Sequence, residues 1–81
     1  MKDDTKELAK AGEEIYETRL KALLEPKYRG KIVAIEVESG EYFLGDREVE
    51  AFEKGRKKHP AKVFYFKRVG FRAVHTVCQT L

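Results

Sequence analysis

Eight basic side chains lie in the last third of the chain. They are the first candidates for a chemical role in this sequence. After Glu53 the sequence holds these eight Lys and Arg residues and no acid, with aromatic residues at 64–66 and 71 among them. Cationic and aromatic side chains on one exposed surface suit phosphate contacts and the stacking of unpaired bases. The candidate residues for contact with a nucleic acid or an acidic partner are Lys54, Arg56, Lys57, Lys58, Lys62, Lys67, Arg68 and Arg72.

The same residues have a second interpretation, a solvated charged surface around a buried aromatic strand. Aromatic residues in a central strand usually belong to the core, which favours this interpretation. Five of the basic residues precede the apolar run 63–66 and three follow it. One strand length, about 20 Å at about 3.3 Å per residue, therefore separates the two clusters. Whether they share a surface is open, and no RNA-recognition signature or helix-turn-helix pattern accompanies them.

Few residues have the types or spacing that catalysis requires. His59 and His75 are the two imidazoles, and neither stands at metal-ligand spacing from a second ligand. Cys78 lies three residues after His75, so a regular strand would place them on opposite faces. Glu36 and Glu38 share a strand face as paired catalytic carboxylates would, but they also flank a predicted turn, where solvated acids are ordinary. We therefore expect no enzyme activity, no cofactor and no metal site.

One long amphipathic helix precedes all of these residues. Apolar residues recur at helical spacing as far as Leu24, and Pro26 disfavours helical geometry at Glu25, so the helix should end there. About 20 residues span roughly 30 Å, which is long for so small a domain. We expect part of the apolar stripe to face a partner. The candidate interface residues are Leu8, Ile15, Tyr16, Leu20 and Leu23.

Four strands and a second helix are predicted over the rest of the chain. Runs of β-branched and aromatic residues predict strands at 31–37, 42–44, 63–66 and 71–77, with Ser39 and Gly40 as a hairpin turn. The second helix is expected at 47–58, with Val49 and Phe52 as its apolar stripe.

This order of elements, α-β-β-α-β-β, predicts a single α+β domain over residues 1–81. Residues 1–26 would form the amphipathic helix, and residues 27–81 a core of sheet and helix. A helix joins the second and third strands, so we expect those strands to be parallel neighbours in a four-stranded mixed sheet with the helices packed on it. The long helix should cover the same face as the short one or reach into another subunit.

Residues 28–70 resemble a family of small uncharacterised prokaryotic α/β proteins. The shared pattern is a Tyr-x-Gly-Lys strand opening, a glycine turn, a His-Pro helix end and an Arg-Val strand end. These features fall at Tyr28, Gly30, Lys31, Gly40, His59, Pro60, Arg68 and Val69. The resemblance covers about half the chain and carries no activity with it. It implies a short partner protein, which favours an interaction role.

Length and composition bound the class of protein. The chain has 81 residues, of which 42% are hydrophobic, enough for one core. A domain of this size buries only about 60–65% of its unfolded surface, so association would help to stabilise it. The net charge of +3 is uneven, because residues 41–81 hold nine basic and five acidic residues.

Location and partners follow from the same composition. Cys78 is the single cysteine, which excludes a disulfide within the chain, and no apolar stretch approaches the roughly 20 residues of a membrane span. The polar N-terminus lacks the apolar run of a signal peptide, so we expect a soluble, cytoplasmic protein. The leading hypothesis is a non-enzymatic protein-interaction module, either a homo-oligomer or a subunit of a small complex. The alternative is a nucleic-acid-binding protein that uses the basic residues at 54–72.

Overall fold

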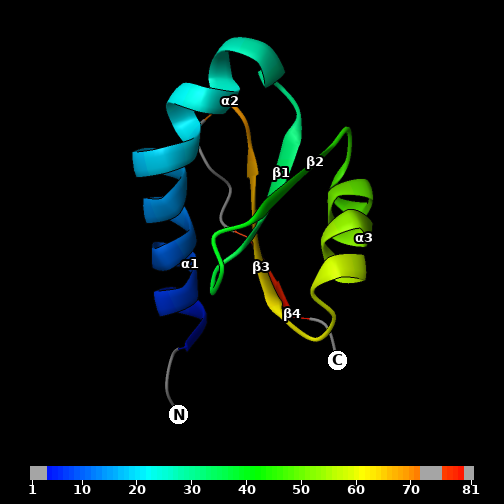
Figure 1. Ribbon diagram of the computed structural model, residues 1–81. Helices are drawn as coiled ribbons and strands as arrows, with labels where there is room; N and C mark the ends of the chain where they lie inside the picture. The colour runs from blue at the N-terminus through cyan, green and yellow to red at the C-terminus, as the bar shows by residue number, and fades with distance from the viewer. Residues whose placement is uncertain (1–3, 72–75, 80–81) are drawn as a thin grey trace.

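The computed structural model describes residues 4–71 and 76–79. One continuous helical stretch, here called the N-terminal helix, covers residues 4–28 and is followed by two strands, a second helix and two more strands (Figure 1). The elements are α1 (Asp4–Ile15), η1 (Tyr16–Leu20), α2 (Lys21–Tyr28), β1 (Ile32–Glu36), β2 (Tyr42–Gly45), α3 (Glu48–Lys58), β3 (Val63–Arg68) and β4 (Thr76–Gln79). The prediction of a small α+β domain is confirmed.

The sheet is antiparallel at every pairing of the described strands, so the prediction of a mixed sheet is wrong. The strand order is β2-β1-β3-β4. β2 and β3 run in the same direction, as the connecting helix requires, but β1 lies between them and is antiparallel to both. The chain leaves β2, crosses β1 through α3 and pairs with the far edge of β1, which makes a split β-α-β unit. β4 then pairs antiparallel with β3.

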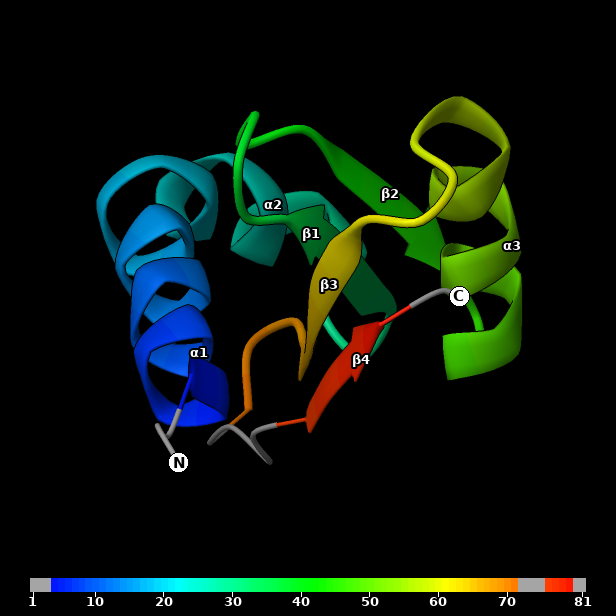
Figure 2. The ribbon, with the colours of Figure 1, turned by 90° about the horizontal axis from the view of Figure 1, so that it is seen from below.

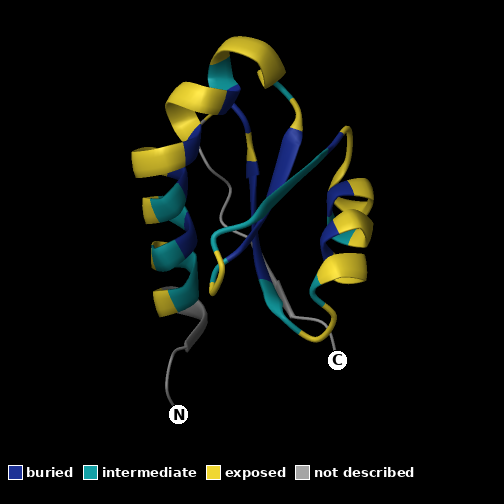
Figure 3. Ribbon diagram, viewed as in Figure 1, coloured by how far each residue is buried: buried dark blue, intermediate teal, exposed yellow. Residues whose placement is uncertain are grey.

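The two helices cover opposite faces of the sheet, in contrast to both expectations for the N-terminal helix. Residues of this helix pack with Val33, Ile35 and Tyr65 on one face. α3 packs with Ala34 and Phe64 on the other face. β1 is buried at all five positions, and the neighbouring part of β3 is buried as well, as Figure 3 shows. A strand that is apolar on both sides needs cover on both sides, which explains the three layers.

Each helix approaches the sheet through a glycine. A Cβ atom at Gly12 would lie 2.3 Å from Cγ of Tyr65, and one at Gly55 would lie 2.6 Å from Cε1 of Phe64. The buried residues of α3 are accordingly the small ones, Ala51 and Gly55. The predicted stripe of α3 is therefore partly wrong, because Val49 is 64% exposed. Small residues let the helix backbone lie close to the aromatic strand.

Two predicted boundaries also differ from the structure. The N-terminal helix continues through Pro26 to Tyr28. Only three residues remain from Pro26 onward, so the proline removes one backbone hydrogen bond near an end that frays in any case. The last strand was expected at 71–77, whereas β4 covers Thr76–Gln79; residues 72–75 of that prediction lie outside the described part. Within the described residues, none of the helices has the length and apolar character needed to cross a membrane.

Candidate functional site

The predicted interface stripe on the N-terminal helix is mostly part of the chain's own core. Tyr16 and Leu20 are buried against the sheet, so they cannot form the exposed interface that was predicted. Leu8 and Ile15 are partly buried, and Ile15 packs against the same core cluster. Leu23 differs from the rest, because its side chain is 55% exposed.

A π turn explains why Leu23 points away from the core. Residues Tyr16–Leu20 form the π-helical segment η1, and the N–H of Lys21 donates to the carbonyl of Tyr16, five residues back. A π turn holds about one residue more than an α turn, so it displaces the side chains that follow by about 100° around the axis. Leu24 therefore takes the buried position, and Leu23 is rotated out of the core.

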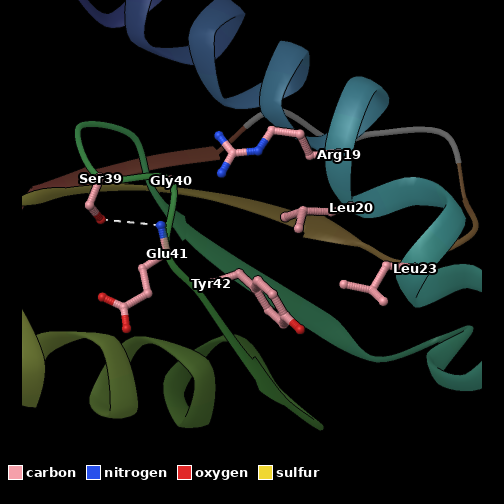
Figure 4. A pocket seen from close by; sticks show the side chains of 7 residues that line it. All are labelled: Arg19, Leu20, Leu23, Ser39, Gly40, Glu41 and Tyr42. Atoms are coloured by element: carbon pink, nitrogen blue, oxygen red, sulfur yellow. Dashed lines mark hydrogen bonds between the residues drawn. The ribbon is translucent and has the colours of Figure 1, made fainter.

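Leu23 stands at the rim of an open hollow between the N-terminal helix and the β1–β2 hairpin (Figure 4). The hollow has a volume of about 480 Å³. It combines an exposed cation, apolar side chains and the polar turn of the hairpin, so it can receive a group that is partly apolar and partly anionic. The lining residues are Arg19, Leu20, Leu23, Ser39, Gly40, Glu41 and Tyr42.

Arg19 supplies the cation of this hollow. Its guanidinium makes no hydrogen bond and no ion pair with any residue in the described part of the chain, and Figure 4 shows it extended toward the hairpin turn. Gly40 leaves room for it, since a Cβ atom there would lie 3.1 Å from Nη1 of Arg19. Gly40 also has a φ of +81°, which favours glycine in the turn. An Arg without an acidic partner is available to an anionic group of a ligand.

A buried carboxylate holds the hairpin turn beside the hollow. Glu36 is almost fully buried, and its side chain accepts hydrogen bonds from the backbone N–H groups of Glu38 and Ser39 at 3.1 and 2.9 Å. Burial alone would raise the pKa of Glu36, but the hydrogen bonds from Ser39 and Glu38 outweigh it and lower the pKa below 4.5. The turn therefore stays ordered around an ionised carboxylate, and Glu36 serves structure here.

A second carboxylate ties the hairpin to the end of α3. Nε2 of His59 lies 2.6 Å from Oε1 of Glu41, a hydrogen bond that the carboxylate accepts, and Nζ of Lys58 lies 3.2 Å from Oε2. The hydrogen bond with His59, and after it the one with Lys58, lowers the pKa of Glu41 below 4.5. His59 also packs edge-on against Phe43. This arrangement gives His59 a structural role at the helix end.

Most of the predicted basic residues at the α3 end of β3 are engaged within the chain. Lys58 pairs with Glu41, and Lys62 pairs with Glu38 at 2.9 Å. Lys54 donates to the carbonyl of Leu44 at 2.7 Å. Arg56 and Lys57 are exposed and make no ion pair with a described residue. The five residues lie near one end of β3, and Lys54, Arg56 and Lys57 have no acidic partner among the described residues.

The other predicted basic residues lie at the opposite end of β3. Lys67 is only 6% exposed; it donates to the carbonyl of Phe71, and its Nζ lies 4.7 Å from the ring centre of Tyr16. Desolvation lowers the pKa of this amine. Arg68 donates to the carbonyl of Gly30 at 3.0 Å. Arg72 lies outside the described residues. The structure therefore separates the two basic clusters by the length of β3.

The remaining candidates for chemistry do not converge. Glu38 pairs with Lys62, so Glu36 and Glu38 do not form a carboxylate dyad. His75 lies outside the described residues, and Cys78 is known only by its backbone place in β4, opposite Phe64. Among residues 4–71 and 76–79, no group of three or more His, Cys, Asp and Glu residues could hold a metal ion.

Sequence reasoning found Leu23 but missed Arg19 and Tyr42 as its neighbours. The hairpin prediction placed Tyr42 in a short return strand, and Arg19 was not among the predicted site residues. Regular helical spacing places Leu23 near the core face, and the π turn that rotates it outward has no distinct residue pattern. The sequence therefore could not show that Arg19 lacks an acidic partner among the described residues, and only the fold shows it.

Comparison with known proteins gives no independent guide to this site. The chain matches no protein-family model, no curated protein and no solved structure. The resemblance to small prokaryotic α/β proteins therefore stays a prediction.

Proposed function

We propose that the chain is a non-enzymatic protein-interaction module whose contact surface is the hollow between the N-terminal helix and the β1–β2 hairpin. The observation that carries this proposal is Leu23, which is 55% exposed beside an Arg19 that has no acidic partner in the described chain. A half-exposed leucine next to a free guanidinium, above a partly buried Tyr42, has the composition of a protein contact.

The position of the π turn supports the same proposal. A regular helix would keep Leu23 near the core face, whereas the observed helix buries Leu24 and places Leu23 on the rim of the hollow. π turns inside helices are frequent at functional sites, and a contact with a partner would cover the exposed Leu23.

Nucleic-acid binding has less support. Lys58 and Lys62 each face a carboxylate, Lys67 is buried, and Lys54 donates to the carbonyl of Leu44. Arg56 and Lys57 remain as the exposed basic residues of α3 that have neither a hydrogen bond nor an ion pair with a described residue. Two cations supply a weak phosphate contact, because each neutralised phosphate adds only one counterion-release step.

Site-specific photo-crosslinking tests the proposal. A photoreactive amino acid is placed at Leu23, or at Val49 as the matched control, in the full chain inside the cells that express it. Val49 is also apolar and is 64% exposed, but it lies on α3, at the opposite face of the sheet. We expect a discrete covalent adduct from position 23, either with a second copy or with another protein, and none from position 49.

The adduct should also depend on the cation. Arg19→Ala should reduce the yield at position 23, whereas Arg56→Ala on α3 should leave it unchanged. Equal adducts from positions 23 and 49, or no adduct from position 23, would overturn the proposed function.

A further inference from the structure

β2 is an outer strand of the sheet, next to β1 (Figure 2). One row of its backbone groups therefore points away from β1. The N–H of Glu36 donates to the carbonyl of Glu41 at 2.8 Å, so these two residues form a hydrogen-bonded pair. Such pairs alternate along an antiparallel ladder, which places Phe43 in the next one, opposite Ala34. The N–H and C=O groups of Tyr42 and Leu44 therefore point outward.

This edge is nearly open. Of the four outward groups, only the carbonyl of Leu44 has a partner in the described chain, the amine of Lys54 at 2.7 Å. The edge runs beside the hollow, because Tyr42 lines the hollow and belongs to β2. Unpaired strand edges are templates for the addition of another strand.

We propose that β2 pairs antiparallel with β2 of a second copy of this chain, about a two-fold axis at Phe43. The inference rests on the proposed function, since it names the partner that occupies the hollow. The result is a symmetric dimer with one continuous sheet across both copies. A two-fold interface must be self-complementary. Each residue of the β2 edge must therefore fit the residue that it meets in the second copy.

The backbone and the apolar side chains satisfy that test. With Phe43 on the axis, Tyr42 lies opposite Leu44 of the second copy, and each pair exchanges two N–H···O=C bonds. Tyr42 and Leu44 both pack at the margin of the core under the N-terminal helix, so their side chains lie on the same face. The two-fold axis therefore generates the same Tyr–Leu cross-strand contact twice, and such pairs stabilise a sheet.

The charges are complementary as well. The same register places Gly40 opposite Asp46 of the second copy. Gly40 is the residue beside the guanidinium of Arg19, so Arg19 would meet a carboxylate from across the axis. Asp46 is well exposed, with 65% of its side chain accessible, and its present partner is the exposed Lys31. One end of the β2 edge thus has a cation without an acidic partner among the described residues, and the other end has an exposed acid. Antiparallel pairing brings the two together twice.

An extended acidic segment of another protein could also add to β2, but it would use only one half of this pattern. Arg19 would attract its acid, whereas Asp46 at the other end of β2 would repel it. The second copy matches both ends, because each end of β2 meets its opposite. The observations therefore favour self-pairing.

Under this proposal, Lys54 opposes pairing at the β2 edge. Its amine caps the outward carbonyl of Leu44 in the single chain, and it must leave when the strands pair. A lysine at a strand edge is a common device against uncontrolled pairing. Lys54→Met removes the cap and should tighten the dimer several-fold.

Sedimentation equilibrium of the full chain tests the inference. We expect a monomer–dimer equilibrium with a dissociation constant in the micromolar range, as suits a small contact. Arg19→Asp and Asp46→Arg should each weaken the dimer about tenfold or more, because each sets like charges against each other across the axis. The double variant, Arg19→Asp with Asp46→Arg, should restore the dimer.

Glu53→Arg is the matched control for the charge reversals. Glu53 is exposed on α3 and makes no ion pair with a described residue, so its reversal should leave the dimer unchanged. Circular dichroism and urea midpoints show which variants remain folded, and rescue by the double variant cannot arise from misfolding. A chain that stays monomeric, including as Lys54→Met, overturns self-pairing, as does a dimer that neither single reversal weakens.

The two proposals fail in different ways. A monomeric chain that still gives a position-23 adduct with a different protein overturns self-pairing and leaves the interaction module standing. The absence of any adduct at position 23 overturns the interaction module itself. A dimer that forms without such an adduct places self-association away from the hollow, which contradicts both.

Discussion

The two faces of the sheet bury different kinds of side chain. The face under α3 is aromatic, and the rings of Phe43, Phe52, Phe64 and Phe66 meet edge to face at centroid distances of 5.8–6.3 Å. The face under the N-terminal helix instead buries polar atoms, the hydroxyls of Tyr16 and Tyr65 and the amine of Lys67. One layer is closed and apolar, while the other holds groups that must each be satisfied by a partner.

This contrast indicates that the two faces have different roles within one small domain. Edge-to-face aromatic packing adds about 0.5–1.5 kcal/mol per pair beyond area burial, so the α3 face stabilises the fold. The face under the N-terminal helix buries polar groups as well as apolar ones. It also contains the π turn, the hollow and the exposed Leu23. The predictions that follow test whether stability resides mainly on the first face and binding on the second.

The largest expected effect is the loss of the central ring of the α3 face. Phe64 is fully buried and contacts both Phe43 and Phe52. Phe64→Ala should lower the free energy of unfolding by about 3–5 kcal/mol, measured by urea denaturation. Val49→Ala, on the exposed side of α3, is the control and should change it by less than about 0.5 kcal/mol. Equal losses would break the comparison.

Alkaline pH should act on the other face. Desolvation by burial raises the pKa of Tyr16 and of Tyr65 to about 12. A folded pKa above the ordinary value of 10.0 means that the stabilisation is complete below pH 10 and is lost as the pH rises toward 12. A pKa of about 12 in place of 10.0 corresponds to about 2–3 kcal/mol of folding stability for each hydroxyl.

Phenolate absorbance and circular dichroism, followed together, measure this loss. We expect Tyr65→Phe to unfold at higher pH than the parent chain, because it removes one of the two buried hydroxyls. The amine of Lys67 acts in the opposite sense, since its lowered pKa makes its burial easier as pH rises. An alkaline midpoint that Tyr65→Phe leaves in place would contradict the polar character assigned to this face.

The two close-approach glycines allow a direct comparison of the helices. Alanine at Gly12 would meet Cβ and Cγ of Tyr65, which are held by the backbone, at 2.3–2.5 Å. Alanine at Gly55 would meet the far edge of the Phe64 ring at 2.6 Å, and that edge can move more easily. Overpacking costs about 1–3 kcal/mol, and alanine returns about 1 kcal/mol of helix propensity.

Gly12→Ala should therefore destabilise the fold by about 1–2 kcal/mol, and Gly55→Ala by less, as measured by thermal unfolding. The reverse order would mean that α3, rather than the N-terminal helix, is the more rigidly seated element.

The smallest effect concerns the hairpin that both faces share. The lowered pKa of Glu36 means that its stabilisation is present above pH 4.5 and is lost as the pH falls through the lower folded value. Glu36→Gln should flatten the acid side of the stability curve, with Glu48→Gln on exposed α3 as the control. A curve that Glu36→Gln does not change would remove Glu36 from the support of the hollow.

Local patterns predicted the elements of this fold but not their arrangement. Gly40 marked the hairpin, and the spacing of Tyr16, Leu20 and Leu24 marked the buried side of the N-terminal helix. Nothing local could show that β3 joins the far edge of β1, because both edges of a buried strand offer the same hydrogen bonds.

The candidate site was less predictable than the fold. The π turn changes the direction of Leu23 without changing the apolar spacing before it. Arg19 and Gly40 are 21 positions apart in the chain, and only the packed helix brings them together. The basic residues, which were conspicuous in the sequence, are largely engaged by Glu38 and Glu41 or by backbone carbonyls.

Amide hydrogen exchange of the full chain, in dilute and concentrated solution, tests the account most directly. The outward amides of Tyr42 and Leu44 should exchange freely in the single chain and become protected when β2 pairs. The account predicts this added protection at high concentration, and its loss in Asp46→Arg, with no change around Val49 on α3. Exchange at Tyr42 and Leu44 that is independent of concentration, or new protection on the outer face of α3, would contradict it.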